Sequence, residues 1–341
     1  MRAQRVVITG PHAVEVQDVD LAPPGPGEML LQAEHTLISA GTETAAIRGL
    51  TAGSREHAGR PRPIGYSFVG VVREVGPEVA TWKVGQRIAG QAPHASWAVV
   101  AADRAFVRVP EDLPPEQATF VSLLAIALNG VRLAHIQIGE PVAVVGQGLV
   151  GQLAAQFARI NGARPVVALD VLDSRLEIAR ANGATHTINV RDAGSEEELA
   201  GAVRAATGGD GPRVVVEATG VPGPVVTALK IAGHGARVVL LGSTRGLVQA
   251  WDPYTDVHKK AITIVGAHSP SSHPPVATFW NPFTVTKNMA IALDLVRDGS
   301  LHLDRLVSHR FSGDQAPEAF AHLISTPAEH LGVLLDWRRT T

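Results

Sequence analysis

The spacing of hydrophobic and polar residues changes near Pro115. Before it, short runs alternate apolar and polar side chains and are separated by turns rich in glycine and proline, such as Pro23–Gly27. This pattern predicts an almost entirely β-stranded region that opens with a hairpin of Arg5–Thr9 and Ala13–Asp18. One short helix is expected in this region, and it runs through Ile47.

After Pro115 the apolar residues recur at helical spacing, first over Glu116–Ala134. Buried strands and helices then alternate as far as Gly266, which predicts a parallel sheet with helical crossovers. From His268 onward the pattern loosens and is expected to return to the first domain. The predicted class is α/β, with a β-rich domain over 1–120 and 270–341 and a parallel-sheet domain over 121–269. Its parallel strands are expected at Pro141–Val145, Val166–Leu169, Thr187–Asn189, Arg213–Glu217, Arg237–Leu241 and Ala261–Gly266.

A glycine-rich segment joins the first of these strands to a helix. It reads Gly146-Gln147-Gly148-Leu149-Val150-Gly151, and the strand that follows the helix ends on Asp170. Strand, glycine turn, helix, strand and acid together are the signature of a dinucleotide-binding unit. The first glycine allows a tight turn, the second lets the backbone approach a pyrophosphate, and the third lets the helix pack closely on the strand. The free N–H groups at the start of the helix would bind the phosphate charge.

The acid at the end of the second strand favours NAD over NADP. Asp170 can accept hydrogen bonds from both hydroxyls of the adenosine ribose, and its carboxylate would repel a 2′-phosphate. No arginine follows directly. Arg175 is a candidate for stacking on the adenine or contacting the phosphates, although a solvated arginine at a helix start explains it equally well.

Composition narrows the class of protein. Lys and Arg number 30 against 32 Asp and Glu, for a net charge of -2, so a nucleic-acid or polyphosphate binder is not expected. The sequence has no cysteine, which excludes disulfides and thiolate zinc sites. The first residues lack the apolar core of a signal peptide, and no apolar run is long enough for a membrane span. A cytoplasmic protein is therefore expected.

Several phrases resemble the medium-chain dehydrogenase/reductase superfamily of zinc-type alcohol dehydrogenase-like proteins. They include ISAGTE at 38–43, IGYSFVGVVREVG at 64–76, KVGQRIAG at 83–90 and EATG at 217–220, and the resemblance extends over essentially the whole chain. ISAGTE is most similar to the bacteriochlorophyllide a dehydrogenase-like branch. The resemblance implies a GroES-like catalytic domain, a Rossmann domain with a doubly wound parallel sheet, a cleft between them, and hydride transfer with a nicotinamide cofactor.

The resemblance also assigns cofactor contacts beyond the glycine motif. Four residues that follow strands are expected at the ribose, and the backbone of three more at the carboxamide. The first group is Thr219, Gly220, Gly242 and Ser243, and the second is Ala267, His268 and Ser269. The final strand of the sheet is expected at an edge, and in relatives this strand pairs with its symmetry mate. A homodimer, or a dimer of dimers, is therefore expected through Ile262–Val265.

The zinc ligands of the resembled family are missing. Ala40 stands where a cysteine is expected, Tyr66 where a histidine is expected, and Leu123–Ala125 offers no third ligand. The four-cysteine structural lobe is absent as well. A zinc-free member is therefore predicted, and the alternative is an improvised metal site made from Glu43, His94 and His268.

Without zinc, a side chain must stabilise the developing oxyanion or remove the alcohol proton. Tyr66 is the best candidate because it occupies the position of a zinc ligand, and Thr42 lies where relatives relay protons. Glu43 is a nearby acid, and His94 is a candidate because histidine is the usual side chain for proton transfer. Three of them have a structural alternative: Tyr66 as a tyrosine that fills the vacated space, Glu43 as an acid paired with an arginine, and His94 as a loop histidine. Trp280 and Phe283, with Trp251 and Tyr254, are expected either in an apolar substrate pocket or in the core.

Three functions remain open at this point. The first is an NAD-dependent, zinc-independent oxidoreductase that interconverts an alcohol and a ketone or aldehyde. The second is a quinone or enone reductase, which would prefer NADPH and would need no zinc because conjugation already polarises its substrate. The third is a catalytically silent NAD-binding protein. The sequence does not name the substrate.

Overall fold

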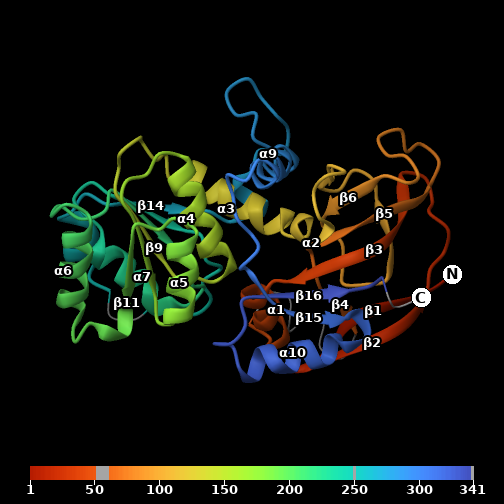
Figure 1. Cartoon of the computed structure of the whole chain (residues 1–341), viewed down its shortest axis with the longest axis horizontal. Helices are drawn as coiled ribbons and strands as arrows, with labels where there is room; N and C mark the ends of the chain where they lie inside the picture. Colours follow the sequence, from red (N-terminus) through yellow and green to blue (C-terminus); the bar gives the residue numbers. More distant parts are fainter. Residues whose placement is uncertain (51–60, 249–250, 339–341) are drawn as a thin grey trace. The chain divides into compact units, whose positions relative to one another are not determined.

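The computed structural model describes residues 1–50, 61–248 and 251–338, and the chain forms two compact units (Figure 1). Unit 1 comprises Met1–Leu123, Val285–Gly299 and Leu303–Thr341. Unit 2 comprises Leu124–Thr284 and Ser300–His302. The chain therefore returns to the first unit at Val285, later than residue 270, where the loosened pattern predicts the return, and residues 270–284 belong to unit 2.

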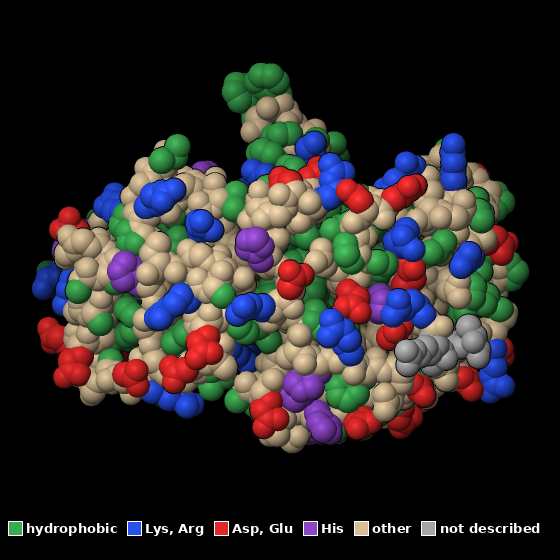
Figure 2. All heavy atoms as spheres, viewed as in Figure 1, with side chains coloured by type: hydrophobic (Ala, Val, Ile, Leu, Met, Phe, Trp, Pro, Cys, Tyr) green, Lys and Arg blue, Asp and Glu red, His purple; other side chains and the backbone are tan. Residues whose placement is uncertain are grey.

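Charged side chains of both signs are interspersed on the face shown in Figure 2. This distribution agrees with the nearly balanced composition of the sequence. In the described parts of the chain, no helix has the length and apolar character that a membrane span requires.

Unit 1 contains two sheets. The smaller one has the order β2-β1-β4 and begins with the predicted antiparallel hairpin; its strands are β1 (Arg2–Gly10), β2 (Ala13–Asp20) and β4 (Arg62–Pro63). The larger one has the order β15-β16-β3-β5-β6-β8, with β7 also paired to β3. Its strands are β3 (Glu28–Ile38), β5 (Phe68–Val75), β6 (Arg87–Gly90), β7 (Trp97–Ala101), β8 (Phe106–Arg108), β15 (Val307–Ser312) and β16 (Gly332–Asp336).

One apolar core supports unit 1. Side chains from the long central strand β3, such as Met29 and Leu31, pack with Phe68 of β5 and Phe320 of a C-terminal helix. Burial of these large apolar groups is the main stabilising contribution. The helices of unit 1 are α1 (Ala40–Ile47), α2 (Pro115–Ala118), α9 (Val285–Arg297) and α10 (Ala316–Ser325), with a 3-10 turn, η3 (Gly313–Gln315).

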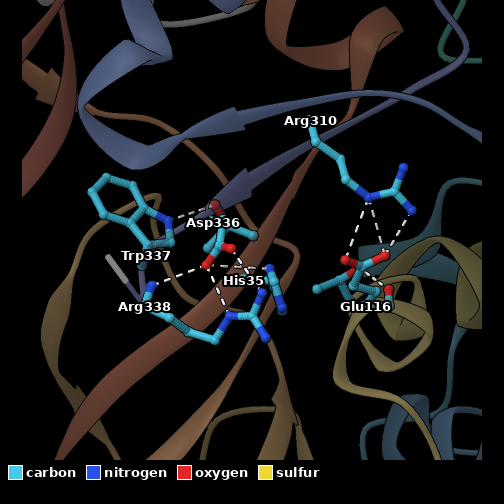
Figure 3. Close-up of polar contacts among 8 residues, drawn as sticks. His35, Glu116, Arg310, Asp336, Trp337 and Arg338 are labelled. Atoms are coloured by element: carbon cyan, nitrogen blue, oxygen red, sulfur yellow. Dashed lines mark hydrogen bonds and ion pairs between the residues drawn. The ribbon is translucent and has the colours of Figure 1, made fainter. Parts of the chain in front are cut away.

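The last strand of unit 1 is fixed to β3 by polar contacts (Figure 3). Trp337 follows β16, and its Nε1 donates to Thr36 Oγ1 at 3.0 Å. Asp336 accepts a hydrogen bond from the Arg338 guanidinium, which lowers the pKa of that carboxyl to about 2. The same carboxylate lies 3.8 Å from the ring of His35, which is buried.

Unit 2 contains the predicted parallel sheet, in the order β11-β10-β9-β12-β13-β14. Side chains of one face pack with the helices α6 and α7, and Ala168 on the other face packs with α5. Helices therefore cover both faces of the sheet, as a doubly wound fold requires. The strands are β9 (Val142–Val145), β10 (Val166–Asp170), β11 (His186–Asn189), β12 (Val214–Glu217), β13 (Arg237–Leu240) and β14 (Thr263–Gly266). The helices are α4 (Leu149–Ile160), α5 (Asp173–Ala181), η1 (Val190–Asp192), α6 (Glu196–Ala206), α7 (Pro222–Ile231), η2 (Tyr254–His258) and α8 (Ser269–Ser272).

The structure corrects two boundaries. The helix predicted over Glu116–Ala134 is interrupted after α2, and α3 runs only over Val121–Leu133. Thr119 Oγ1 donates to the carbonyl of Glu116 at 2.6 Å, so its side chain competes with the regular backbone pattern. The final strand begins at Thr263 rather than at Ala261, because Ala261 has a φ of 52° and is not extended.

Candidate functional site

The glycine turn between β9 and α4 can be built only with glycines at its first and third positions. Gly146 has a φ of 90°, and a Cβ there would lie 2.6 Å from Thr219 Cγ2. A Cβ on Gly151 would lie 1.8 Å from the carbonyl oxygen of Gly146. A Cβ on Gly148, by contrast, would meet nothing within 4 Å. The turn therefore leaves open space at Gly148, where the N-terminus of α4 offers N–H groups to a phosphate.

Asp170 ends β10 and points back to this turn. Its Oδ2 accepts from the backbone N of Gln147 at 2.6 Å, and its Oδ1 accepts from the backbone N of Val171 and of Leu172 at 2.8 and 3.0 Å. The carboxylate is thus held in one orientation, and Oδ2 has room for a second donor. Arg175, half-buried on α5, contributes its carbonyl as the acceptor for Gln152 Nε2 at 2.8 Å.

The remaining motif residues point in different directions. Gln147 is fully buried and donates to the carbonyl of Val144 at 3.0 Å, so its side chain supports the turn from inside. Leu149 and Val150 open α4, where Leu149 is buried and Val150 half-buried. The motif therefore offers a ligand its backbone rather than these side chains.

The loops after β12 and β13 lie against this turn. Thr219 and Gly220 follow β12, and Gly242 and Ser243 follow β13. A Cβ on Gly242 would lie 2.5 Å from the backbone N of Gly220, so these two loops are in direct contact. Ligands of open α/β sheets bind at these carboxyl ends of the strands.

Glu217 is a residue of this region that sequence reasoning missed. It is the last residue of β12, it is fully buried, and its Oε1 accepts from the backbone N of Thr219 at 2.7 Å. An acid that ends an otherwise apolar strand, directly before Ala-Thr-Gly, is the signal that could have found it.

The segment expected at the carboxamide follows β14. Ala267 is buried and donates its N–H to the carbonyl of Leu240 at 3.1 Å, which continues the contact with β13. His268 is exposed, with Nδ1 2.9 Å from Ser271 Oγ, and Ser269 begins the short helix α8. These residues therefore lie at the same edge of the sheet as the loops after β12 and β13.

In unit 1, the structure brings three of the four predicted catalytic residues into one network. Tyr66 Oη donates to Ser39 Oγ at 2.6 Å, and the backbone N of Ser39 donates to Glu43 Oε1 at 2.9 Å. Glu43 Oε2 lies 2.8 Å from His94 Nε2. Thr42 lies next to Glu43 in the first turn of α1 and is partly exposed. Glu43 therefore pairs with a histidine, and the alternative of an arginine partner is wrong.

The three segments of this network also meet through the backbone. Gly65 has a φ of 107°, and a Cβ there would lie 2.6 Å from the backbone N of His94. That N–H donates to the carbonyl of Ile64 at 2.9 Å. Ser122 Oγ donates to the carbonyl of Tyr66, also at 2.9 Å. Tyr66 is thus held at both its backbone and its hydroxyl, and its ring is partly exposed.

These residues do not fit a zinc ion held in the manner of the resembled family. Ala40 has no donor, and the Tyr66 hydroxyl is engaged with Ser39. Glu43 and His94, two members of the improvised set, are 2 % and 0 % exposed and bind each other. Among residues 1–50, 61–248 and 251–338, no three His, Cys, Asp or Glu side chains are grouped so that they could hold a metal ion.

The aromatic residues proposed for a substrate pocket or the core are mostly exposed. Trp280 is 89 % exposed and packs edge-on against Phe279, which is equally exposed, with ring centroids 5.0 Å apart. The guanidinium of Arg132 lies over the ring of Phe283, with Cζ 3.5 Å from the ring centroid. The core interpretation is wrong for Trp280, and also for Trp251 and Tyr254, which are 43 % and 59 % exposed.

Comparisons with known proteins find similarity to dehydrogenases. The family described as zinc-binding dehydrogenase matches residues 150–280. L-threonine 3-dehydrogenase of Pyrococcus abyssi is 29% identical over 341 residues, which cover 91% of this chain and 91% of that protein. D-xylulose reductase of Saccharomyces cerevisiae is 25% identical over 306 residues, with 81% and 82% covered.

Solved structures match over almost the full length. A candidate zinc-binding dehydrogenase from Sinorhizobium meliloti 1021, bound to NADP, is 26% identical and superposes with a TM-score of 0.81 over 98% of this chain and 99% of that one. An Escherichia coli oxidoreductase of unknown specificity has a TM-score of 0.84 at 16% identity, with the same coverage, and this likeness shows the fold alone.

Proposed function

Because the chain is a medium-chain dehydrogenase of the zinc-type alcohol dehydrogenase-like superfamily, we propose that it interconverts an alcohol and a ketone or aldehyde with NAD(H) and without zinc. The observation that carries the proposal is the hydroxyl pair of Tyr66 and Ser39 at the position where relatives would place a zinc ligand. Unit 2 would bind the cofactor and unit 1 would supply the proton chemistry. The cofactor, when bound, accepts or donates the hydride.

Tyr66 would act at the substrate oxygen. In the reducing direction its hydroxyl would donate a hydrogen bond to the oxyanion that forms as the carbonyl accepts the hydride, and then the proton itself. The Ser39 hydroxyl, 2.6 Å away, can exchange donor and acceptor roles with it and would stabilise the phenolate. Thr42, beside the network, would pass the proton to solvent.

Glu43 and His94 would act through Ser39 and Tyr66 rather than on the substrate. Both are buried, so neither side chain is accessible to a ligand in the described structure. Glu43 accepts a hydrogen bond from the backbone N–H of Ser39 and pairs with the ring of His94. The backbone N–H of His94 donates to the carbonyl of Ile64, which precedes Gly65. Their proposed role is to fix the distance between the two hydroxyls.

The preference for NAD rests on Asp170. Its orientation by three backbone N–H groups leaves Oδ2 able to accept from a ribose hydroxyl, and a 2′-phosphate would meet a carboxylate. The Sinorhizobium meliloti relative was solved with NADP, so cofactor choice within the superfamily must be measured for this chain.

Three further properties belong to this proposal. The ISAGTE phrase suggests the bacteriochlorophyllide a dehydrogenase-like branch. The open edge of β14 suggests a homodimer or a dimer of dimers. A cytoplasmic location is the third property, and it rests on the expectation stated in the sequence analysis.

The test is turnover with a panel of secondary alcohols and their ketones, including L-threonine and D-xylulose, with NAD(H) and NADP(H) in parallel. Protein purified without added metal should turn over with NAD(H) and contain far less than one zinc per chain. Activity only on enones or quinones with NADPH would support the alkene-reductase function. Binding of NADH without turnover of any panel member would support a silent NAD-binding protein. Stoichiometric zinc that chelators remove together with activity would overturn the zinc-free proposal.

A further inference from the structure

We propose that Glu217 is a positioning residue for the cofactor. Its carboxylate accepts hydrogen bonds from both loops that follow β12 and β13, and so holds the two loops together. This inference rests on the proposed function only in that unit 2 binds a nicotinamide dinucleotide. No motif of the sequence analysis assigned Glu217 a role.

The carboxylate has donors on both loops. On the β12 side, Oε1 accepts from the backbone N of Thr219 at 2.7 Å and also from the Thr219 hydroxyl. On the β13 side, Oε2 accepts from Thr244 Oγ1 at 3.2 Å. The carbonyl of Glu217 accepts in addition from the backbone N of Leu241 and of Gly242, at 2.9 and 2.7 Å. Glu217 and Thr244 are 27 residues apart in the sequence. One residue therefore fixes two loops that are distant along the chain.

Thr219 transmits this anchoring to the glycine turn. Its Cγ2 occupies the space that a Cβ on Gly146 would need, at 2.6 Å, and its backbone N lies 2.9 Å from the position of a Cβ on Gly242. A shift of Thr219 would therefore displace either the first glycine of the dinucleotide motif or the loop after β13. The orientation of Thr219 sets the spacing between three backbone segments at the carboxyl edge of the sheet.

A buried carboxyl group is costly unless donors surround it. Glu217 is 0 % exposed, and the donors that it has come from the residues of the two loops. An apolar side chain would pack at this position without that cost but would leave the Thr219 N–H without its acceptor and would remove the bond from the Thr244 hydroxyl, whose other acceptor, the carbonyl of Gly242 at 3.4 Å, lies on its own loop. The buried carboxylate of Glu217 is therefore explained by the two loops that it joins rather than by the packing of the sheet.

The test separates cofactor positioning from stability. Thr244→Val removes the bond to the second loop at nearly constant volume, and we expect the KM for NAD and the Kd for NADH to rise about fivefold to tenfold, the factor that one hydrogen bond supplies. The KM for the alcohol should change by less than twofold. Glu217→Met, which removes both anchors, should have a larger effect, and Glu217→Gln should restore most of the affinity because its amide can accept from Thr219 and donate to Thr244.

Thr207→Val is the matched control. Thr207 is buried in the same unit, and its Oγ1 donates to the carbonyl of Val203 at 2.7 Å at the end of α6. It should lower the unfolding temperature as much as Thr244→Val does and leave the Kd for NADH unchanged. If Thr244→Val and Glu217→Met lose stability but bind NADH as the wild type does, the positioning role is wrong. If the wild type itself does not bind NADH, the proposed function fails instead.

Discussion

The carboxylate of Glu43 and the imidazole of His94 lie 2.8 Å apart, and both side chains are shielded from solvent. They join the first turn of α1 to the loop before β7, and the loop that carries Tyr66 packs on His94 through Gly65. A buried polar network of this kind fixes one geometry when its members are paired. In this protein the geometry it fixes is the contact between the hydroxyls of Ser39 and Tyr66.

Tyr66→Phe removes the proposed acid at the substrate oxygen. We expect kcat to fall about 10²- to 10⁴-fold, the usual contribution of general acid–base catalysis, with an unchanged Kd for NADH. Ser39→Ala should lower kcat less and shift the pH profile of kcat, because the phenol loses its hydrogen-bond partner. Steady-state kinetics and NADH titration measure both effects. Full activity of Tyr66→Phe would exclude this residue as the proton donor.

Glu43→Ala should destabilise the protein because it leaves a buried histidine and the Ser39 N–H without their acceptor. A buried group that loses its hydrogen bond costs about 1–3 kcal/mol. Urea denaturation monitored by tryptophan fluorescence would measure the loss. Glu111→Ala, at an exposed glutamate, is the control and should change the free energy of unfolding by less than about 0.5 kcal/mol. Equal stability of the two variants would mean that the pair does not hold unit 1 together.

Asp170→Ala should narrow the preference for NADH over NADPH. The wild type is expected to bind NADH more tightly, because Asp170 accepts from the ribose and repels a 2′-phosphate. The variant loses both effects, so NADH should bind more weakly and NADPH more tightly. Fluorescence titration with each cofactor measures the ratio. Equal affinities in the wild type would show that Asp170 does not read the ribose.

His35 should make unit 1 less stable in acid. Burial, and then the charge of Arg338, lower its pKa from the ordinary value of 6.5, although Asp336, Glu116 and Glu34 oppose the shift. Figure 3 shows His35 beside Asp336 and Arg338. Below pH 6.5 the unfolded chain binds a proton that the folded chain resists, so stability present above that pH is lost as the pH falls through the lowered pKa.

The measurement for His35 is the free energy of unfolding at pH 7.5 and at pH 5.5. His35→Gln should reduce the difference between the two values, since glutamine does not titrate. His186→Gln, at an exposed histidine, should leave the difference as it is in the wild type. A pH dependence that is the same in all three proteins would contradict this assignment.

Ile264→Pro should weaken the predicted dimer. β14 is an edge strand of the sheet in unit 2, and Ile264 is 39 % exposed on it. Proline lacks the N–H that a symmetry-related strand would need. Sedimentation at micromolar concentration should show a dimer or tetramer for the wild type and a smaller species for the variant. A monomeric wild type would disprove the assembly.

The sequence by itself determined the parallel-sheet domain and the glycine turn. Both depend on local properties: buried strands show as apolar runs, and Gly146 and Gly151 are required by backbone geometry within a few residues of the motif. The position of Asp170 at the end of β10 follows from the same pattern. The hairpin at the N-terminus was also predictable, because its two strands are neighbours in the chain.

Only the tertiary structure decided which polar groups meet. Glu43 and His94 are 51 residues apart, and Ser39 and Tyr66 are 27 apart, so neither pair follows from local spacing. Glu217 was missed because its role depends on Thr244, which lies on another strand's loop. The break after α2 likewise does not show in the apolar pattern, and it coincides with the bond from the Thr119 hydroxyl to the carbonyl of Glu116. Local periodicity records which face of an element is buried, whereas hydrogen bonds between distant segments form only once the chain has folded and brought them together.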